Sequence, residues 1–326
     1  MTRLYPLSFH SIYKTKIWGG DKLRNILGKD VGNLQKVGES WDISSVEEDI
    51  TVVSNGFLAG NNLQELVEIY MGDLVGDKVY EKFGIEFPLL IKFIDAGDNL
   101  SVQVHPDDET AFKHHHAYGK TEMWYVIQAD PGSEIIIGFK KDVTREEYLE
   151  HLRNKTLRDI LNSEQALAGD VYYIPPGRIH AIGKGVLLVE IEQNSDITYR
   201  IYDWDRVDAH GKSREIHTEL ALEVMDFKSY PQYKVPYKDQ LNRTTGLVQC
   251  NYFSTQLIHF DKPVEKDYYE LDSFVIYIGI EGETEIEHEN GTSVLKMGET
   301  LLIPAVLKDI RLIPKGEAKI LEVYIK

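Results

Sequence analysis

The segments GDVYYIPPGRIHAI at residues 169–182 and GETLLIPAVLKDI at residues 298–310 together decide the fold. Each opens with a glycine and an acid, runs through a strand-like stretch to Ile-Pro, and continues to a polar position. His180 in the first copy and Asp309 in the second stand at the same distance from the opening glycine. A repeated β unit of this size predicts two packed β-sandwich barrels, of which only the first keeps a metal-binding histidine. The alternative is chance similarity between two strand–turn–strand segments, because Gly and Pro mark turns in any β protein.

The rest of the chain is also dominated by expected strands. Short runs rich in β-branched and aromatic residues are bounded by Gly, Pro or Asp, which is typical of strands. The sequence therefore predicts a mainly β protein, and the regular spacing of the runs is typical of a sandwich or barrel. The clearest expected strands are 87–96, 122–129, 133–139, 170–175 and 185–193.

Helical patterns are confined to a few segments. Asn and Asp caps open two expected helices within about residues 61–84, and a longer helical insertion is expected over about 142–163. Residues 228–243 are polar and interrupted by proline, so a linker or wrapping segment is expected there. We therefore expect one domain over residues 1–238 and a second β domain without metal ligands over residues 239–326.

Length, charge and cysteine content exclude several classes of protein. The 326 residues suffice for about two domains, and the formal charge of −17 disfavours a large basic surface for nucleic acid. The sequence has no apolar run approaching about 18 residues, and its first residues lack the apolar stretch of a signal peptide. A single cysteine, Cys250, cannot form an internal disulfide. We expect a cytoplasmic protein with Cys250 as a small buried residue rather than a nucleophile.

Four polar residues form a candidate metal site. Gln103 and His105 are two residues apart on an expected strand, so their side chains point to the same face. Glu122 opens the next long strand and His180 follows a Pro-Pro-Gly turn, positions from which both can converge on that face. Two imidazoles and a carboxylate with an open position are typical of catalytic zinc, and the Gln103 amide oxygen can be a fourth ligand. Taken singly, each histidine is more often a core or surface residue.

The spacing of the candidate ligands matches signatures of the cupin superfamily. The first signature is partly present, with Gln103 where the usual pattern has histidine and with Glu122 delayed by a helix-bearing insertion. These two departures are features of one particular cupin family. The second signature is complete and consists of Gly169, Pro175, Gly177 and His180.

The sequence resembles the type I mannose-6-phosphate isomerases, in their short bacterial form. This resemblance implies a mainly β fold of two cupin-type (jelly-roll) β-sandwich barrels with a small helical insertion. It also implies a cytoplasmic enzyme that interconverts mannose 6-phosphate and fructose 6-phosphate through an enediol. The matching segments span nearly the whole chain: 17–23, 38–44, 88–109, 119–127, 172–206 and the C-terminal β block.

The resemblance implies one zinc ion (Zn2+) per chain, held by the four residues that the spacing nominates: Gln103, His105, Glu122 and His180. A zinc ion can polarise a carbonyl or hydroxyl oxygen and orient the sugar. Two other readings stay open. One is a non-enzymatic cupin that binds a sugar phosphate, and the other is a different metal-dependent cupin enzyme, such as an oxygenase.

The resemblance also implies residues that act on the substrate. Arg200 matches the active-site arginine, and its guanidinium can stabilise an enediolate oxygen. Ser101 and Lys120 match substrate-contacting groups, whereas Glu190 and Asp196 match acidic positions near the reacting carbons. The alternatives are a structural salt bridge for Arg200 and a solvated loop position for Lys120.

The proton-transferring base stays open at this point, because several groups near the reacting carbons are chemically able. These groups are Glu190, Lys120, Asp196 and a zinc-bound water. The expected partner is a small sugar phosphate, with no nucleic acid or membrane, in a monomer or weak homodimer. The C-terminal barrel is expected to cover apolar surface of the catalytic domain.

Two other features suggest metal sites only superficially. The run 114–116 contains three consecutive histidines, but neighbours on an expected helix point in different directions, so a solvated face is expected. The acidic stretch 281–291 lacks the ligand spacing of a calcium loop. A β-hairpin turn at 289–291 explains it more simply.

Overall fold

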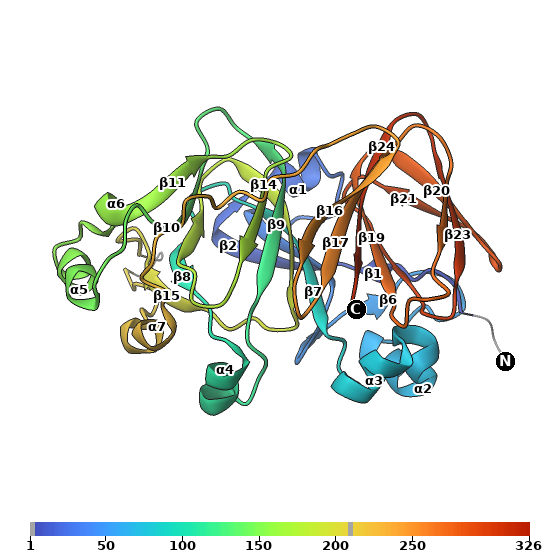
Figure 1. Ribbon diagram of the computed structural model, residues 1–326, viewed down its shortest axis with the longest axis horizontal. Coiled ribbons are helices and arrows are strands. Elements are labelled where there is room, and N and C mark those ends of the chain that lie inside the picture. Colours follow the sequence, from blue (N-terminus) through green and yellow to red (C-terminus); the bar gives the residue numbers. More distant parts are fainter. Residues whose placement is uncertain (1–3, 208–210) are drawn as a thin grey trace.

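The structure is a computed structural model that describes residues 4–207 and 211–326. Two β-sandwiches lie side by side, and most of the helices sit at their ends and edges (Figure 1). The mainly β fold with two sandwiches confirms the fold class expected from the sequence. The sheets of both sandwiches are open rather than closed barrels.

The first sandwich consists of two antiparallel sheets. Two short strand pairs flank them: β1 (Phe9–His10) with β6 (Val52–Val53), and β4 (Ser45–Val46) with β5 (Asp49–Ile50). The six-stranded sheet has the order β12 (Val171–Ile174), β9 (Glu122–Ala129), β14 (Val186–Gln193), β7 (Leu89–Asp95), β3 (Val37–Ile43) and β2 (Ile12–Gly20). The five-stranded sheet has the order β11 (Leu161–Gln165), β10 (Glu134–Phe139), β13 (His180–Ile182), β8 (Val102–Val104) and β15 (Tyr199–Tyr202).

The second sandwich is built in the same way from the C-terminal residues. Its five-stranded sheet has the order β16 (Arg243–Gln249), β17 (Ser254–Phe260), β24 (Ala318–Tyr324), β19 (Val275–Glu281) and β22 (Thr300–Ile303). Its four-stranded sheet has the order β18 (Val264–Asp267), β23 (Asp309–Pro314), β20 (Glu283–His288) and β21 (Gly291–Lys296). The hairpin expected at 289–291 is the turn between β20 and β21.

Seven helices connect the strands within the described ranges. Side chains at Asn62 and Thr144 form capping boxes, which satisfy free backbone amides at the starts of α2 and α5. The helices are α1 (Lys22–Asn25), α2 (Leu63–Val75), α3 (Asp77–Phe83), α4 (Asp108–His115), α5 (Arg145–Arg153), α6 (Leu157–Ile160) and α7 (Thr218–Val224). Helices α2 and α3 lie within the stretch 61–84 that the sequence indicates.

The helical expectation over 142–163 is wrong at its C-terminal end. Helix α6 ends at Ile160, and residue 161 already begins β11, which pairs with β10 at the edge of the five-stranded sheet. Lys155, between α5 and α6, has a φ of 56° and interrupts the helix. Strand β11 forms by hydrogen bonding to β10, which lies far from it in the sequence. A local sequence pattern therefore does not indicate this pairing.

The repeat seen in the sequence corresponds to equivalent strand pairs. Strands β12 and β13 follow the first opening glycine, and β22 and β23 follow the second. Gly169 and Gly298 have φ values of 88° and 80°, a left-handed conformation that favours glycine. His180 and Asp309 are the first residues of β13 and β23. His180 is buried between the sheets, whereas Asp309 is exposed.

A continuous apolar core joins the two sandwiches. Residues from the outer face of the six-stranded sheet, including Phe93 and Val189, pack in one cluster with Leu257 and Val323 of the C-terminal five-stranded sheet. Figure 1 shows β7 and β9 next to β16 and β17. The segment expected to link the halves runs along the first sandwich, because the backbone amide of Val235 donates to the carbonyl of Val171 (2.8 Å). The exact division after residue 238 stays a prediction.

Every helix in residues 4–207 and 211–326 is too short or too polar to cross a membrane.

A chain ending at Asn242 tests the shared core. We expect this truncation to expose the apolar outer face of the six-stranded sheet and to lose most of its yield in the supernatant, because exposed apolar patches of this extent cause aggregation. The measurement is the recovered yield and the thermal melting curve, with the full-length chain as control. A well-folded, fully active truncated protein would contradict this prediction.

Candidate functional site

The pairing of three neighbouring strands brings candidate residues onto one face. In the five-stranded sheet, β8 lies between β13 and β15, and Gln103 pairs with His180 on one side and with Arg200 on the other. Directly paired residues present their side chains on the same face of a sheet. The alternate residues Val102 and Val104 belong to the apolar cluster on the opposite face. Gln103, His180 and Arg200 therefore face the interior of the sandwich.

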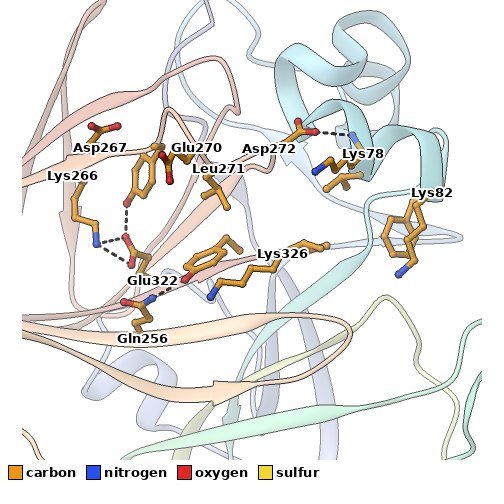
Figure 2. A pocket seen from close by; sticks show the side chains of 15 residues that line it. Lys78, Lys82, Gln256, Lys266, Asp267, Glu270, Leu271, Asp272, Glu322 and Lys326 are labelled. Carbon is orange, nitrogen blue, oxygen red and sulfur yellow. Dashed lines mark hydrogen bonds and ion pairs between the residues drawn. The ribbon is translucent and has the colours of Figure 1, made fainter.

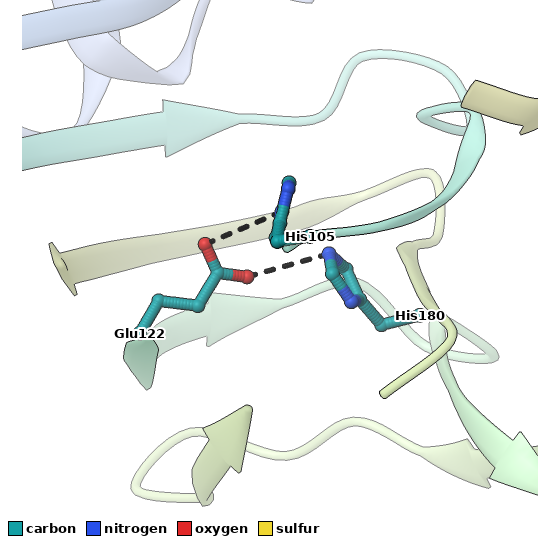
Figure 3. A group of neighbouring side chains, drawn as sticks. All are labelled: His105, Glu122 and His180. Atoms are coloured by element: carbon teal, nitrogen blue, oxygen red, sulfur yellow. Dashed lines mark ion pairs between the residues drawn. The ribbon is translucent and has the colours of Figure 1, made fainter. Parts of the chain in front are cut away.

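Two further candidates complete a compact cluster. Glu122 begins β9 in the opposite sheet, and His105 directly follows β8 (Figure 3). The Nε2 atom of His105 lies 3.7 Å from Glu122 Oε2, and the Nε2 atom of His180 lies 3.3 Å from Glu122 Oε1. One donor atom from each residue lies within 4.8 Å of the others, and all three side chains are buried.

The ring orientation of both histidines is held by backbone carbonyls. The Nδ1–H group of His105 donates to the Ile197 carbonyl (2.8 Å), and that of His180 donates to the Arg178 carbonyl (2.8 Å). Burial lowers the pKa of His105 well below its usual value and lowers the pKa of His180 to about 4. Both rings are therefore neutral, with the Nε2 lone pair turned toward Glu122, which is the form that binds a metal.

The donor atoms in this cluster have no hydrogen-bond partner. The Nε2 atoms of His105 and His180 and both carboxylate oxygens of Glu122 are buried and make no hydrogen bond to any residue that the structure describes. Buried polar atoms normally have a partner, so this cluster is an exception that needs an explanation. Two neutral imidazoles and a carboxylate match the ligands of a divalent cation. Gln103, half-buried opposite His180, can supply a fourth ligand through its amide oxygen.

A network of buried charges lies beside the cluster on the six-stranded sheet. The ammonium of Lys92 lies 2.6 Å from Glu192 Oε1 and 3.6 Å from Glu190 Oε2. The ammonium of Lys120 lies 2.8 Å from Glu192 Oε2. The indole of Trp124 donates to Glu190 Oε1 (2.8 Å). These contacts hold both carboxylates in fixed positions inside the sandwich.

The same network sets the protonation of its members. Burial would raise the pKa of Glu190, but the ammonium groups of Lys120 and Lys92 hold it well below its usual value. Burial and the charge of Glu190 raise the pKa of Glu192. Burial would lower the pKa of Lys120, but Glu192 and then Glu122 raise it well above its usual value. Glu190 is therefore ionised, and Lys120 carries a charge.

Within the described ranges, two groups of ligands are close enough to hold a cation, but their contacts with ammonium groups differ. Glu122, Glu190 and Glu192 also lie within 4.8 Å of one another. Glu192 is already paired with two ammonium groups, whereas Glu122 has one longer contact, with the Lys120 ammonium (3.4 Å). The pair of histidines around Glu122 contributes no positive charge, because both rings are neutral. The group formed by the histidines and Glu122 is therefore the better cation site.

Arg200 is held by a neighbouring segment of backbone. Its Nη1 donates to the Glu215 carbonyl (3.0 Å), and its backbone amide donates to Nδ1 of His217 (3.0 Å). The backbone amide of His217 donates in return to the Arg200 carbonyl (2.8 Å). Among the described residues, Asp203 pairs with Arg206 and Arg214, and no ion pair joins it to Arg200. Asp205 pairs with Lys155 instead, so within residues 4–207 and 211–326 no ion pair joins Arg200 to the aspartates near it in the sequence.

A basic cavity of about 360 Å³ opens beside Arg200. It spans the two sheets, because Ile17 of β2 lines it together with Arg200 of β15. Arg206 and Arg214 line the same cavity. Burial and the charge of Arg214 lower the pKa of Arg200. This concentration of guanidinium groups favours an anionic ligand at the edge of the sandwich.

Ser101 and Asp196 lie in different surroundings. Ser101 is buried two residues before Gln103. Asp196 is exposed and lines a separate cavity of about 1020 Å³ beside α4, which none of the expected metal ligands lines. The structure does not bring Asp196 into the cluster around Glu122, and the substrate-contacting roles of Ser101 and Asp196 stay predictions.

Three residues of the site are absent from the candidates that the sequence nominates, namely Lys92, Glu192 and His217. Lys92 is a charged residue in the middle of the buried strand β7, and Glu192 lies two positions after Glu190 on β14. A charge in a buried strand was a usable signal, because an isolated buried charge needs a partner. His217 gives no such signal, because it lies in a segment without strand or helix pattern.

The remaining features of the sequence do not converge on a site. His114 bonds to Glu223 (3.0 Å), and His115 bonds to the Tyr199 hydroxyl (2.9 Å), so neighbouring histidines face different partners. Cys250 is half-buried, and burial raises the pKa of its thiol, which suits a structural residue.

A cavity of about 530 Å³ lies between α3 and the C-terminal sandwich (Figure 2). Its four lysines face four carboxylates, and Glu322 is already paired with Lys266 (2.7 Å). The lining therefore has no excess charge, and none of the expected site residues lies in it.

Comparison with known proteins identifies the family. Residues 7–126 match the family described as phosphomannose isomerase type I, catalytic domain, and residues 243–325 match the mannose-6-phosphate isomerase cupin domain. The chain is 36% identical to mannose-6-phosphate isomerase ManA of Bacillus subtilis, over 94% of this chain and 95% of that protein. The chain belongs to the type I phosphomannose isomerase family. It is therefore an isomerase.

Further comparisons agree with this membership of the type I phosphomannose isomerases. The mannose-6-phosphate isomerase of Streptococcus mutans is 36% identical over 93% of each chain. The crystal structure of the mannose 6-phosphate isomerase from Bacillus subtilis superposes with a TM-score of 0.85 at 32% identity, covering 98% of this chain and 99% of that one. A putative mannosephosphate isomerase from Archaeoglobus fulgidus, with a TM-score of 0.81 at 23% identity, shares the fold over 100% of both chains.

The substitution His180→Ala tests the cation site. We expect affinity for a divalent cation to fall by at least about 100-fold, because the change removes one of the four proposed protein ligands. The measurement is metal content after dialysis, combined with a titration of the stripped protein.

His151→Ala is the matched control, because His151 bonds to Thr156 Oγ1 (2.8 Å) outside the site. Its metal content should equal that of the unmodified protein. Unchanged metal binding in His180→Ala would remove His180 from the ligand set.

Proposed function

We propose that this protein is a zinc-dependent isomerase that interconverts mannose 6-phosphate and fructose 6-phosphate. The observation that carries the proposal is the convergence of buried donor atoms on His105, Glu122 and His180 that make no hydrogen bond within the described residues, with Arg200 on the same inner face. Membership of the type I phosphomannose isomerase family supplies the substrate class.

The donor set supports zinc as the metal. Two imidazoles, the Glu122 carboxylate and the Gln103 amide oxygen are nitrogen and oxygen ligands of the kind that zinc binds in catalytic sites. A zinc ion held by these residues would act as a Lewis acid, polarising a carbonyl or hydroxyl oxygen of the sugar. Ser101, two residues before Gln103 in the chain, is the proposed further contact to the sugar.

Isomerisation moves a proton between C2 and C1 of the substrate through an enediol. We assign this transfer to Glu190, because its carboxylate is ionised and the Trp124 indole and the Lys92 ammonium fix its position. Lys120 stays protonated and therefore serves as a positive charge beside the reacting oxygens rather than as the base.

The arginine side chains have two separate proposed roles, at the enediolate oxygen and at the phosphate group. Arg200 lies opposite Gln103 in the strand pairing and also lines the basic cavity, so it connects the metal cluster with that cavity. It stabilises the negative charge that develops on the enediolate oxygen. Arg206 and Arg214 are the proposed contacts to the phosphate group.

The composition of the sequence supports proposals for the cellular location and the partner of the enzyme. The single cysteine supports a reducing, cytoplasmic location. The formal charge of −17 argues against a nucleic-acid partner, and a small sugar phosphate is the expected partner. A monomer or weak homodimer is the expected assembly.

A coupled assay for fructose 6-phosphate tests the proposed reaction. Metal-stripped protein should be inactive with mannose 6-phosphate and should regain activity when zinc is added. Arg200→Ala should lower kcat by about 100-fold to 1000-fold, because it removes a charge from the developing enediolate. One bound zinc ion without turnover would contradict the proposal and would favour a non-enzymatic sugar-phosphate-binding protein.

The substitution Glu190→Gln tests the proton-transfer step. We expect exchange of the C2 proton with solvent, followed by NMR in deuterated water, to slow by about 100-fold to 10000-fold. Zinc content should stay at the level of the unmodified protein, because Glu190 is outside the proposed ligand set. Normal exchange at C2 would remove Glu190 as the base.

A further inference from the structure

The segment that carries Lys120 is held through three consecutive backbone amides. The amide of Gly119 donates to Asp108 Oδ1 (2.9 Å), and the amide of Lys120 donates to the Pro106 carbonyl (2.9 Å). The amide of Thr121 donates to Gln193 Oε1 (2.8 Å). This backbone therefore depends on one carboxylate, one carbonyl and one side-chain amide for its position.

The C-terminal sandwich contributes directly to this arrangement. Tyr252 lies in the turn between β16 and β17, and its hydroxyl donates to Asp108 Oδ2 (2.7 Å). The other oxygen, Asp108 Oδ1, accepts from Gln193 Nε2 (2.9 Å) as well as from Gly119. A continuous chain of hydrogen bonds thus runs from Tyr252 through Asp108 and Gln193 to Thr121, the residue between Lys120 and Glu122.

The contact between this segment and the start of α4 leaves little freedom. A Cβ atom at Gly119 would lie 2.5 Å from the backbone nitrogen of Asp108 and 2.5 Å from the backbone carbon of Asp107. The two backbones are therefore closely packed, and a shift of Asp108 moves the segment at 119–121 with it.

We propose that Tyr252 is a positioning residue for Lys120, and that the C-terminal sandwich thereby completes the active site. The tyrosine hydroxyl orients the Asp108 carboxylate, and this carboxylate fixes the backbone on which Lys120 lies. The effect on turnover rests on the proposed function of Lys120. The C-terminal sandwich then has a role in catalysis besides covering apolar surface.

The substitution Tyr252→Phe tests this proposal in the full-length, zinc-loaded protein. It removes only the hydroxyl and keeps the ring in the interface. We expect kcat to fall by about 3-fold to 10-fold with KM changed less than about twofold, because small misplacements of a group at the reacting atoms slow the chemical step. The backbone amides of Gly119 and Thr121 should exchange with solvent faster, as measured by hydrogen–deuterium exchange.

Tyr269→Phe is the matched control. Tyr269 lies on the same sandwich, and its hydroxyl bonds to Asp309 (3.0 Å), away from the site. This variant should keep the kcat and the amide exchange of the unmodified protein. An equal loss in both variants would overturn the proposal, because it would show a general effect on the sandwich.

A double-mutant cycle separates positioning from simple destabilisation. In the background of Asp108→Ala, adding Tyr252→Phe should cause no further loss of kcat, because both changes break the same chain of hydrogen bonds. Independent, additive losses would overturn the proposal, and so would unchanged amide exchange in Tyr252→Phe alone. A wild-type protein without activity on mannose 6-phosphate would refute the proposed function, whereas amide exchange would still decide whether Tyr252 holds residues 119–121.

Discussion

The pairing of β8 with β13 and β15 determines the geometry of the whole site. His180 and Arg200 both lie opposite Gln103, so one strand register aligns two candidate ligands and the arginine. A slip by one residue would turn these side chains into the apolar layer that includes Val102 and Val104. The apolar side chains under α5 and α7 oppose such a slip, because it would expose them to the charged interior. Hydrophobic packing on one face of the sheet thus keeps the candidate site residues in position on the other face.

Balanced charge is the second requirement of this interior. Three buried carboxylates and two buried lysines lie close together, and each would be costly without a partner. The ammonium groups of Lys92 and Lys120 satisfy Glu192 and depress the pKa of Glu190. Three carboxylates against two ammonium groups leave an excess of negative charge, and the two neutral histidines beside Glu122 do not offset it, which favours a cation at Glu122. The same electrostatic arrangement that permits burial therefore keeps a carboxylate ionised and an ammonium protonated for the proposed reaction.

Local patterns in the sequence predict a large part of the fold. The expected strands 122–129 and 185–193 agree closely with β9 and β14, because buried strands have a characteristic composition. The end of the helical insertion is wrong, because β11 forms through pairing with β10, which lies far from it in sequence. The charge of Lys92 inside a buried strand indicates that a partner is needed, but the sequence does not show that this partner is Glu192, because the two residues lie on different strands.

Local sequence patterns establish the mainly β class, the repeated strand unit and the residue types of the candidate site, because strand periodicity and turn chemistry act over a few neighbouring residues. The contacts between these residues depend on how the sheets pack. The tertiary structure turned the lone pairs of His105 and His180 toward Glu122, and it joined Tyr252 to Asp108, 144 positions apart in the chain. Such contacts arise when two sheets pack and two sandwiches share a core, and no local pattern encodes the distance between their side chains.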